Sequence, residues 1–98
     1  MRPSTHRAVS HERKVSANTT DIQQFTMPKE TSAIEFCIEG ANSARVTFDS
    51  SDPSAASAPS LVYPSGQVPC FRPVGPGTII RFVSTAASPC VMQMAYYT

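Results

Sequence analysis

The feature that most constrains this chain is its punctuation by proline and glycine between residues 45 and 97. Short runs of β-branched, aromatic and aliphatic residues alternate there with clusters of Pro, Gly and Ser; the runs cover residues 45–48, 60–63, 78–83 and 91–97. Such runs, bounded by turn residues, are typical of β-strands. No segment keeps the period of an amphipathic helix. The sequence therefore predicts an all-β fold of about six to eight short antiparallel strands, arranged as a small β-sandwich or a barrel-like domain.

Two segments in the first half of the chain alternate cleanly between apolar and polar residues. Residues 33–39 and 44–49 each place every second side chain on an apolar face, which is the pattern of a half-buried strand. Residues 40–43 (Gly-Ala-Asn-Ser) join the two segments. We therefore expect a hairpin, in which a glutamate of the first strand pairs with Arg45 of the second.

Two later segments carry a clear expectation of their place in a sheet. Residues 68–74 contain two prolines, which cannot donate to a strand ladder, so this segment is expected to be an edge strand or a broken one. Residues 78–84 are the most apolar and are expected to form a central strand that is covered on both faces. The predicted core comprises Ile34, Phe36, Ile38, Val46, Phe48, Ile80 and Phe82.

The first twenty residues are polar and basic. Only Glu12 opposes four of the eight Lys and Arg residues of the chain, which are Arg2, Arg7, Arg13 and Lys14. Such a segment buries too little apolar surface to order itself, so we expect an extended basic N-terminal arm over residues 1–20 and a β-sandwich domain over residues 21–98. The arm could bind nucleic-acid phosphates or dock onto a partner protein. Its thin charge and lack of interleaved aromatic residues favour docking.

No catalytic or metal-binding constellation stands out in the sequence. The cysteines Cys37, Cys70 and Cys90 have no Cys-x-x-Cys spacing, and no histidine lies beyond residue 11, so zinc lacks a ligand set. Core packing is the favoured role of the cysteines, while a Cys70–Cys90 disulfide stays open. Asp52 before Pro53 is typical of a turn. We expect no enzyme activity, no cofactor and no metal, and no stretch is apolar enough for a transmembrane helix.

Charge is scarce in the second half of the chain. Asp52, Arg72 and Arg81 are the charged residues between positions 51 and 98. This depletion fits either a neutral, hydroxyl-rich surface or the core of an interface. Prolines and small side chains in the loop 49–59 and in the turns 64–66 and 73–77 would let a partner approach at little entropic cost. With the basic arm, these segments supply the predicted partner-binding residues: Arg2, Arg7, Arg13, Lys14, Asp52, Pro53, Ala56, Pro64, Ser65 and Pro76.

An ordered series of turn-bounded segments runs from residue 44 to residue 94. Its members are residues 44–48 (Ala-Arg-Val-Thr-Phe), 51–55 (Ser-Asp-Pro-Ser-Ala), 61–66 (Leu-Val-Tyr-Pro-Ser-Gly), 71–74 (Phe-Arg-Pro-Val), 75–83 (Gly-Pro-Gly-Thr-Ile-Ile-Arg-Phe-Val) and 93–94 (Gln-Met). Over residues 33–97 this series resembles small virion proteins of tailed bacteriophages. In that family, a β-sandwich domain decorates or cements the capsid shell.

The resemblance implies a structural virion protein that is assembled in the host cytoplasm and located in the virion. It would bind across subunits of the major capsid protein, as a homo-oligomer for which a trimer is one candidate. A neck or tail component is an alternative within the same class. A nucleic-acid-binding module that uses the basic arm is an alternative from another class, and its binding would weaken steeply with salt. No membrane partner is expected.

Overall fold

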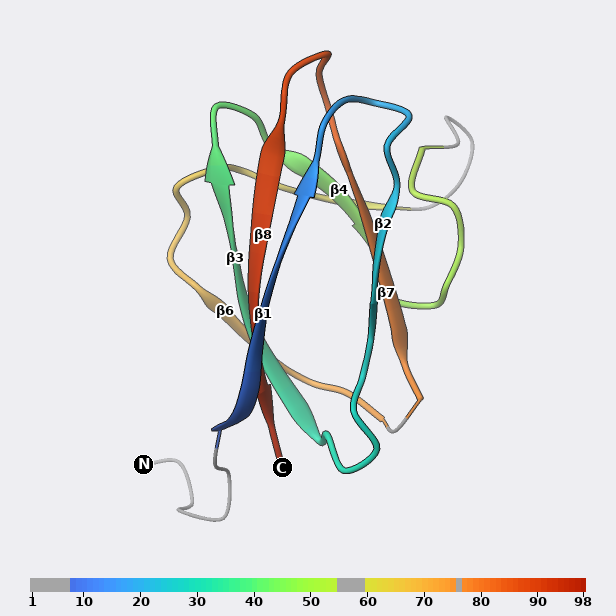
Figure 1. The fold of residues 1–98 in the computed structure, drawn as a ribbon, viewed down its shortest axis with the longest axis vertical. Helices are drawn as coiled ribbons and strands as arrows, with labels where there is room; N and C mark the ends of the chain where they lie inside the picture. Colours follow the sequence, from blue (N-terminus) through green and yellow to red (C-terminus); the bar gives the residue numbers. More distant parts are fainter. Residues whose placement is uncertain (1–7, 55–59, 76) are drawn as a thin grey trace.

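The computed structural model describes residues 8–54, 60–75 and 77–98, with side chains from residue 10 onward (Figure 1). These residues form strands and turns without a helix. The eight strands are β1 (Ala8–Ser16), β2 (Gln23–Thr26), β3 (Ala33–Gly40), β4 (Ala44–Thr47), β5 (Leu61–Tyr63), β6 (Cys70–Pro73), β7 (Ile79–Ser84) and β8 (Cys90–Tyr97). The prediction of an all-β fold is confirmed.

The strands make two antiparallel sheets of four strands each, consistent with a small β-sandwich. The β3–β8 sheet has the order β1-β8-β3-β6, and the β4–β7 sheet has the order β2-β7-β4-β5. Among the described strands, β4 and β5 are the one consecutive pair that shares a sheet. All the remaining connections between consecutive strands cross from one sheet to the other, as Figure 1 shows for β7 and β8.

The predicted hairpin at residues 40–43 is wrong. β3 pairs with β8 and β6, whereas β4 pairs with β7 and β5, so the connection is an arch between the sheets. Gly40, at a φ of 97°, lies at the bend, and the Asn42 side-chain amide donates to the carbonyls of Ser88 and Pro89, at 3.0 and 3.3 Å. These bonds tie this arch to the one that precedes β8. The predicted pairing with Arg45 is also wrong, because Arg45 lies in the other sheet.

The core lies between the sheets and combines aliphatic, aromatic and methionine side chains. Phe25 and Phe82 are fully buried, and their rings stack with centroids 5.7 Å apart. Six of the seven predicted core residues are buried, namely Ile34, Phe36, Ile38, Val46, Ile80 and Phe82. Phe48 is only partly buried, because it follows the last residue of β4 and packs at the margin against Phe36 and Tyr63.

The predicted positions of the two later strands are confirmed. β6, which contains Pro73, is an edge strand of its sheet. β7 is an interior strand, as predicted. The predicted cover on both faces holds at Val83 and Ser84 but not along the whole strand, because Ile79 and Arg81 on the outer face are only partly buried. The prolines therefore identified the edge, and two-sided apolarity identified the interior.

The prediction that residues 1–20 form an arm outside the sandwich is wrong for residues 8–16. These residues are β1, which pairs with β8 from Ala8 to Ser16 (Figure 1). Residues 1–7 lie outside the described residues. A polar sequence can still form a strand here, because the ladder to β8 uses backbone groups and satisfies an edge that would otherwise be open. The sandwich therefore begins before the predicted boundary at residue 21.

Candidate protein-binding surface

One margin of the sandwich is apolar and exposed. β5 and β6 are edge strands of the two sheets, and two contacts place them on the same side of the molecule. The Tyr63 ring of β5 lies 5.0 Å from the Phe36 ring of β3, measured between centroids. Arg72 of β6 lies 4.0 Å from the centre of the Phe48 ring, which follows β4. Four large apolar side chains on this side are exposed. We call them the apolar margin: Leu61 (51%), Val62 (52%), Val68 (79%) and Phe71 (40%).

The apolar margin contributes few charges of its own, but charged side chains of the neighbouring strands lie beside it. Arg45 of β4 is the register partner of Val62, and Glu35 of β3 is the register partner of Phe71. Between residues 60 and 75, Arg72 is the one charged residue in the sequence, and the Phe48 ring covers one face of its guanidinium. Val62 and Phe71 lie on the outer faces of opposite sheets, so the four side chains line the edge of the sandwich and do not form one flat patch. Exposed apolar side chains at a sheet edge are a mark of a protein-binding surface. Sequence reasoning did not identify these four residues, because a strand at residues 60–63 and an edge or broken strand at residues 68–74 do not by themselves show which side chains are exposed. The nearby prolines were the available signal, since they keep β5 and β6 short and at the edge.

The turn at residues 64–66, predicted to face a partner, is fixed to its own chain on one side. The Ser65 hydroxyl donates to the Gly40 carbonyl, and the Gly66 N–H donates to the Ile38 carbonyl at 2.9 Å. Gly66 has a φ of 78°, which favours glycine. Pro64 remains exposed. Pro64 therefore extends the apolar margin, whereas Ser65 stabilises the fold through its hydrogen bond to Gly40.

The loop that begins at Asp49 contains one residue, Pro53, for which the predicted exposure to a partner differs from the structure. Pro53 is fully buried, so its predicted contact with a partner is wrong. Asp52 stays exposed and accepts hydrogen bonds from the Ser54 hydroxyl and N–H, at 2.6 and 2.8 Å; these bonds lower the pKa of its carboxyl. The turn at Asp52 is as expected, and it directs the proline ring into the fold. Ala56 and Pro76 lie outside the described residues, as do Arg2 and Arg7.

The two described basic residues of β1 point in opposite directions. Arg13 is exposed on the outer face of the β3–β8 sheet, opposite Gln93. Lys14 is half-buried on the inner side, with its Nζ 5.8 Å from the centre of the Phe25 ring. The strand alternation therefore prevents these two charges from forming one basic patch.

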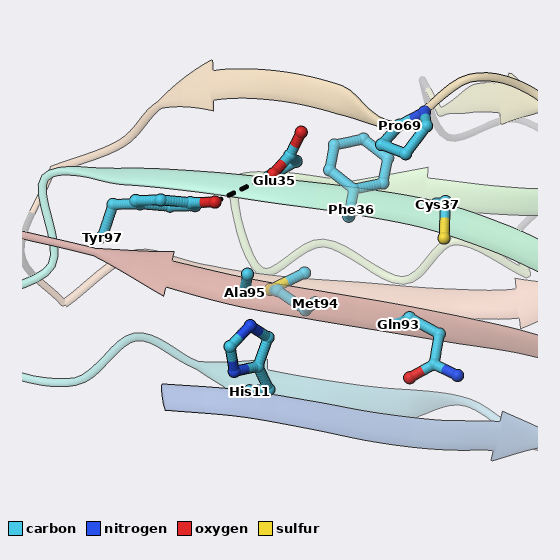
Figure 2. A pocket seen from close by; sticks show the side chains of 9 residues that line it. All are labelled: His11, Glu35, Phe36, Cys37, Pro69, Gln93, Met94, Ala95 and Tyr97. Carbon is cyan, nitrogen blue, oxygen red and sulfur yellow. Dashed lines mark hydrogen bonds between the residues drawn. The ribbon is translucent and has the colours of Figure 1, made fainter. Parts of the chain in front are cut away.

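A shallow hollow lies on the outer face of the β3–β8 sheet (Figure 2). Ala95 is its small floor, because the register places His11 and Glu35 on either side of it across the strands, and Gln93 and Tyr97 flank it along β8. The hollow has a volume of about 240 Å³. The Tyr97 hydroxyl donates to Glu35 at 2.9 Å, the bond drawn in Figure 2. This arrangement offers hydrogen-bonding groups to a small polar group.

The cysteine in this hollow is poorly suited to nucleophilic chemistry. Burial raises the pKa of the Cys37 thiol, and the carboxylates of Glu39 and Glu35 raise it further. A reactive cysteine needs the opposite shift, because the thiolate is the nucleophile. All three cysteines are free thiols. Cys90 is buried as expected for core packing and Cys70 packs partly buried against the core, but the expectation is wrong for Cys37, which lines the hollow on the outer face. Within residues 8–54, 60–75 and 77–98, no group of three or more His, Cys, Asp or Glu side chains could hold a metal ion.

Comparison with protein-family models, curated proteins and solved structures finds no match to this chain. The likeness to bacteriophage virion proteins therefore stays a prediction from the residues quoted above. Within the described part of the chain, no helix is long and apolar enough to cross a membrane.

Proposed function

We propose that this protein is a structural virion protein, a capsid cement or decoration subunit that binds across subunits of the major capsid protein. The observation that carries the proposal is the apolar margin, which exposes four large apolar side chains along edge strands β5 and β6 and the connection between them. A rigid sandwich with an apolar edge suits a role in burying surface at a joint between other proteins. The virion location, the capsid partner and a homo-oligomeric state belong to this proposal.

The energetics of the apolar margin are sufficient for such a role. Fully burying one Val or Leu side chain contributes about 1.5–3 kcal/mol, and association costs several kcal/mol of lost freedom. One margin alone would therefore bind weakly. Several copies that bridge a shell would bind tightly, because each further contact forms at a high effective concentration.

The experiment is a binding measurement on shells assembled from a major capsid protein of a tailed bacteriophage, the proposed partner. Val68→Glu places a charge at the most exposed apolar position, and we expect occupancy on shells to fall at least roughly tenfold, because the charge would be desolvated at the joint. Val15→Glu is the matched control, since Val15 is 38% exposed on β1, away from the apolar margin. Equal occupancy of wild type and Val68→Glu would overturn the role of the margin.

The same preparation separates the alternatives. If the protein does not bind shells but binds purified necks or tails, we would assign it to the neck or the tail of the virion. Binding to DNA that weakens steeply between low and high salt would instead favour the nucleic-acid module. We do not propose that module as a second function, because Arg13 and Lys14 point to opposite faces of β1.

A further inference from the structure

Strand β1 is held in the sandwich without a large apolar anchor among its described side chains. Over residues 10–16, Val15 is the one large apolar residue, and it points outward. The side chains directed to the core side are Ser10, Glu12, Lys14 and Ser16, since they pair across from the buried β8 residues Tyr96, Met94, Met92 and Cys90. The other long strands, β3 and β8, bury apolar side chains on this side.

Polar contacts and the backbone ladder hold β1 in its place. The Tyr96 hydroxyl donates to Glu12 at 2.6 Å, and Glu12 also lies 3.6 Å from Lys14. At the end of the strand, the Ser16 hydroxyl accepts from the Ser84 N–H at 2.9 Å and donates to the Asp21 carbonyl at 2.6 Å. Each such bond has a modest net effect on stability, because water replaces it when the strand leaves.

Departure of β1 would open a sheet edge and would remove no apolar side chain of residues 10–16 from the core. The inward side chains of β8, such as Met92 and Met94, belong to a core cluster that also draws on β2, β3, β4 and β7. Loss of β1 would expose the unpaired backbone edge of β8 and would remove only polar inward side chains, among them Lys14 beside the Phe25 ring. Segments with few buried apolar contacts are those that open locally, at a small fraction of the cost of global unfolding.

We propose that β1 is an exchangeable strand, and that the β8 edge of one copy accepts residues 8–16 of a second copy. A second copy is the partner because its β1 strand can make the same contacts that β1 makes within one chain. These contacts are Glu12 with Tyr96, Lys14 with Phe25 and Ser16 with Ser84. An exposed edge of β8 is a template for an added strand. The connection 17–22 spans at most roughly 20 Å when extended, so the two copies must sit close together. This exchange goes beyond the proposed capsid role and does not require a shell.

Hydrogen exchange on the full chain tests the opening step. We expect the amides of residues 10–15 to exchange roughly tenfold or more faster than the β3 amides, under conditions where the rest of the fold stays closed. Tyr96→Phe removes the bond to Glu12 and should accelerate exchange in β1 further, with β3 unchanged. Tyr97→Phe is the matched control, because Tyr97 bonds Glu35 of β3 on the outer face. Exchange of β1 and β3 at one common rate would overturn the proposal.

A strand-addition experiment tests the acceptor edge. The probe is a fluorescent synthetic peptide of residues 8–16, added to the full chain, and its control is the same residues in scrambled order. We expect the native-order peptide to bind, with NMR shifts along residues 90–97, and the scrambled peptide to leave them unchanged. Two differently tagged full chains, mixed at high concentration, should also form mixed dimers by native mass spectrometry. Equal binding of both peptides, or only monomers in the mixture, would overturn the proposal.

Discussion

The Tyr96 hydroxyl of β8 donates a hydrogen bond of 2.6 Å to the carboxylate of Glu12 on β1. The first strand of the sandwich is thereby joined to the last by a side-chain contact as well as by the ladder. Burial raises the pKa of Tyr96 far above its ordinary value, and the bond to the Glu12 carboxylate and its negative charge raise it further. The phenol therefore keeps its proton wherever the fold is intact at ordinary pH.

This shift predicts a loss of stability in alkaline solution. The folded state holds the Tyr96 proton more tightly than the unfolded chain does, so the stabilising effect is complete below about pH 10 and declines above it. We expect the free energy of unfolding, measured by urea titration, to fall as pH rises from 10 to 11. The Tyr96→Phe variant should show a shallower decline.

Tyr63 is the control for that prediction, because burial raises its pKa in the same direction without a carboxylate bond. Tyr63→Phe should flatten the alkaline decline less than Tyr96→Phe does. An identical pH dependence in wild type and Tyr96→Phe would contradict the assigned role of the Glu12 contact.

Phe82 is the residue whose truncation should cost most in the core. It is fully buried and stacks on Phe25, so Phe82→Ala should lower the free energy of unfolding by roughly 3–5 kcal/mol. That is comparable to the whole stability of a small domain. Phe71→Ala, at an exposed position on β6, should cost far less. Unchanged thermal unfolding of Phe82→Ala would show that the core is assigned incorrectly.

Two prolines that the sequence treated alike should differ when replaced by lysine. Pro53 is buried, so Pro53→Lys would place a charge in an apolar site and should destabilise the fold by roughly 2–3 kcal/mol. Pro64 is exposed, so Pro64→Lys should leave the melting temperature close to that of wild type. Circular dichroism melts of both variants check this. A reversed order would mean that Pro53, and not Pro64, is available to a partner.

The thiols should differ in their reaction with a disulfide reagent at pH 8. Cys90 is fully buried and should react only on unfolding, whereas Cys37 should react in the folded state, more slowly than a free thiol. Glu39→Gln removes a carboxylate that raises the pKa of Cys37, and it should therefore speed the reaction of Cys37. Glu30→Gln, at an exposed turn outside the hollow, is the control. A rate that neither substitution changes would sink the electrostatic explanation.

The sequence predicted which faces are buried more reliably than which strands pair. Alternation in residues 33–39 correctly identified Ile34, Phe36 and Ile38 as inward, because the period of a strand is a local property. It could not show that β3 pairs with β8 instead of β4, since an arch and a hairpin begin with the same turn residues. Pairing partners depend on how the sheets close in three dimensions.

Strand β1 and the apolar margin both show that the sequence does not identify all the edge positions of a sheet. Residues 8–16 are polar, yet they form a strand because they pair with the backbone of β8. The pattern of side chains in a sequence does not show whether such a backbone partner is present. Conversely, Leu61 and Val62 belong to a run that the sequence correctly identifies as a strand, and they are exposed because β5 ends its sheet. Edge position decides burial in both cases, and edge position is a property of the assembled sheet.

The pairing of the first strand with the last has a consequence for synthesis of the chain. As the polypeptide leaves the ribosome, β1 emerges first, yet its neighbour β8 is completed only at Tyr97. β3 can pair with β6 earlier, but its other neighbour is also β8. The β3–β8 sheet therefore lacks an interior strand until residues 90–97 leave the ribosome, and a ribosome stalled before residue 90 would hold β1 and β3 with open edges, a target for chaperones.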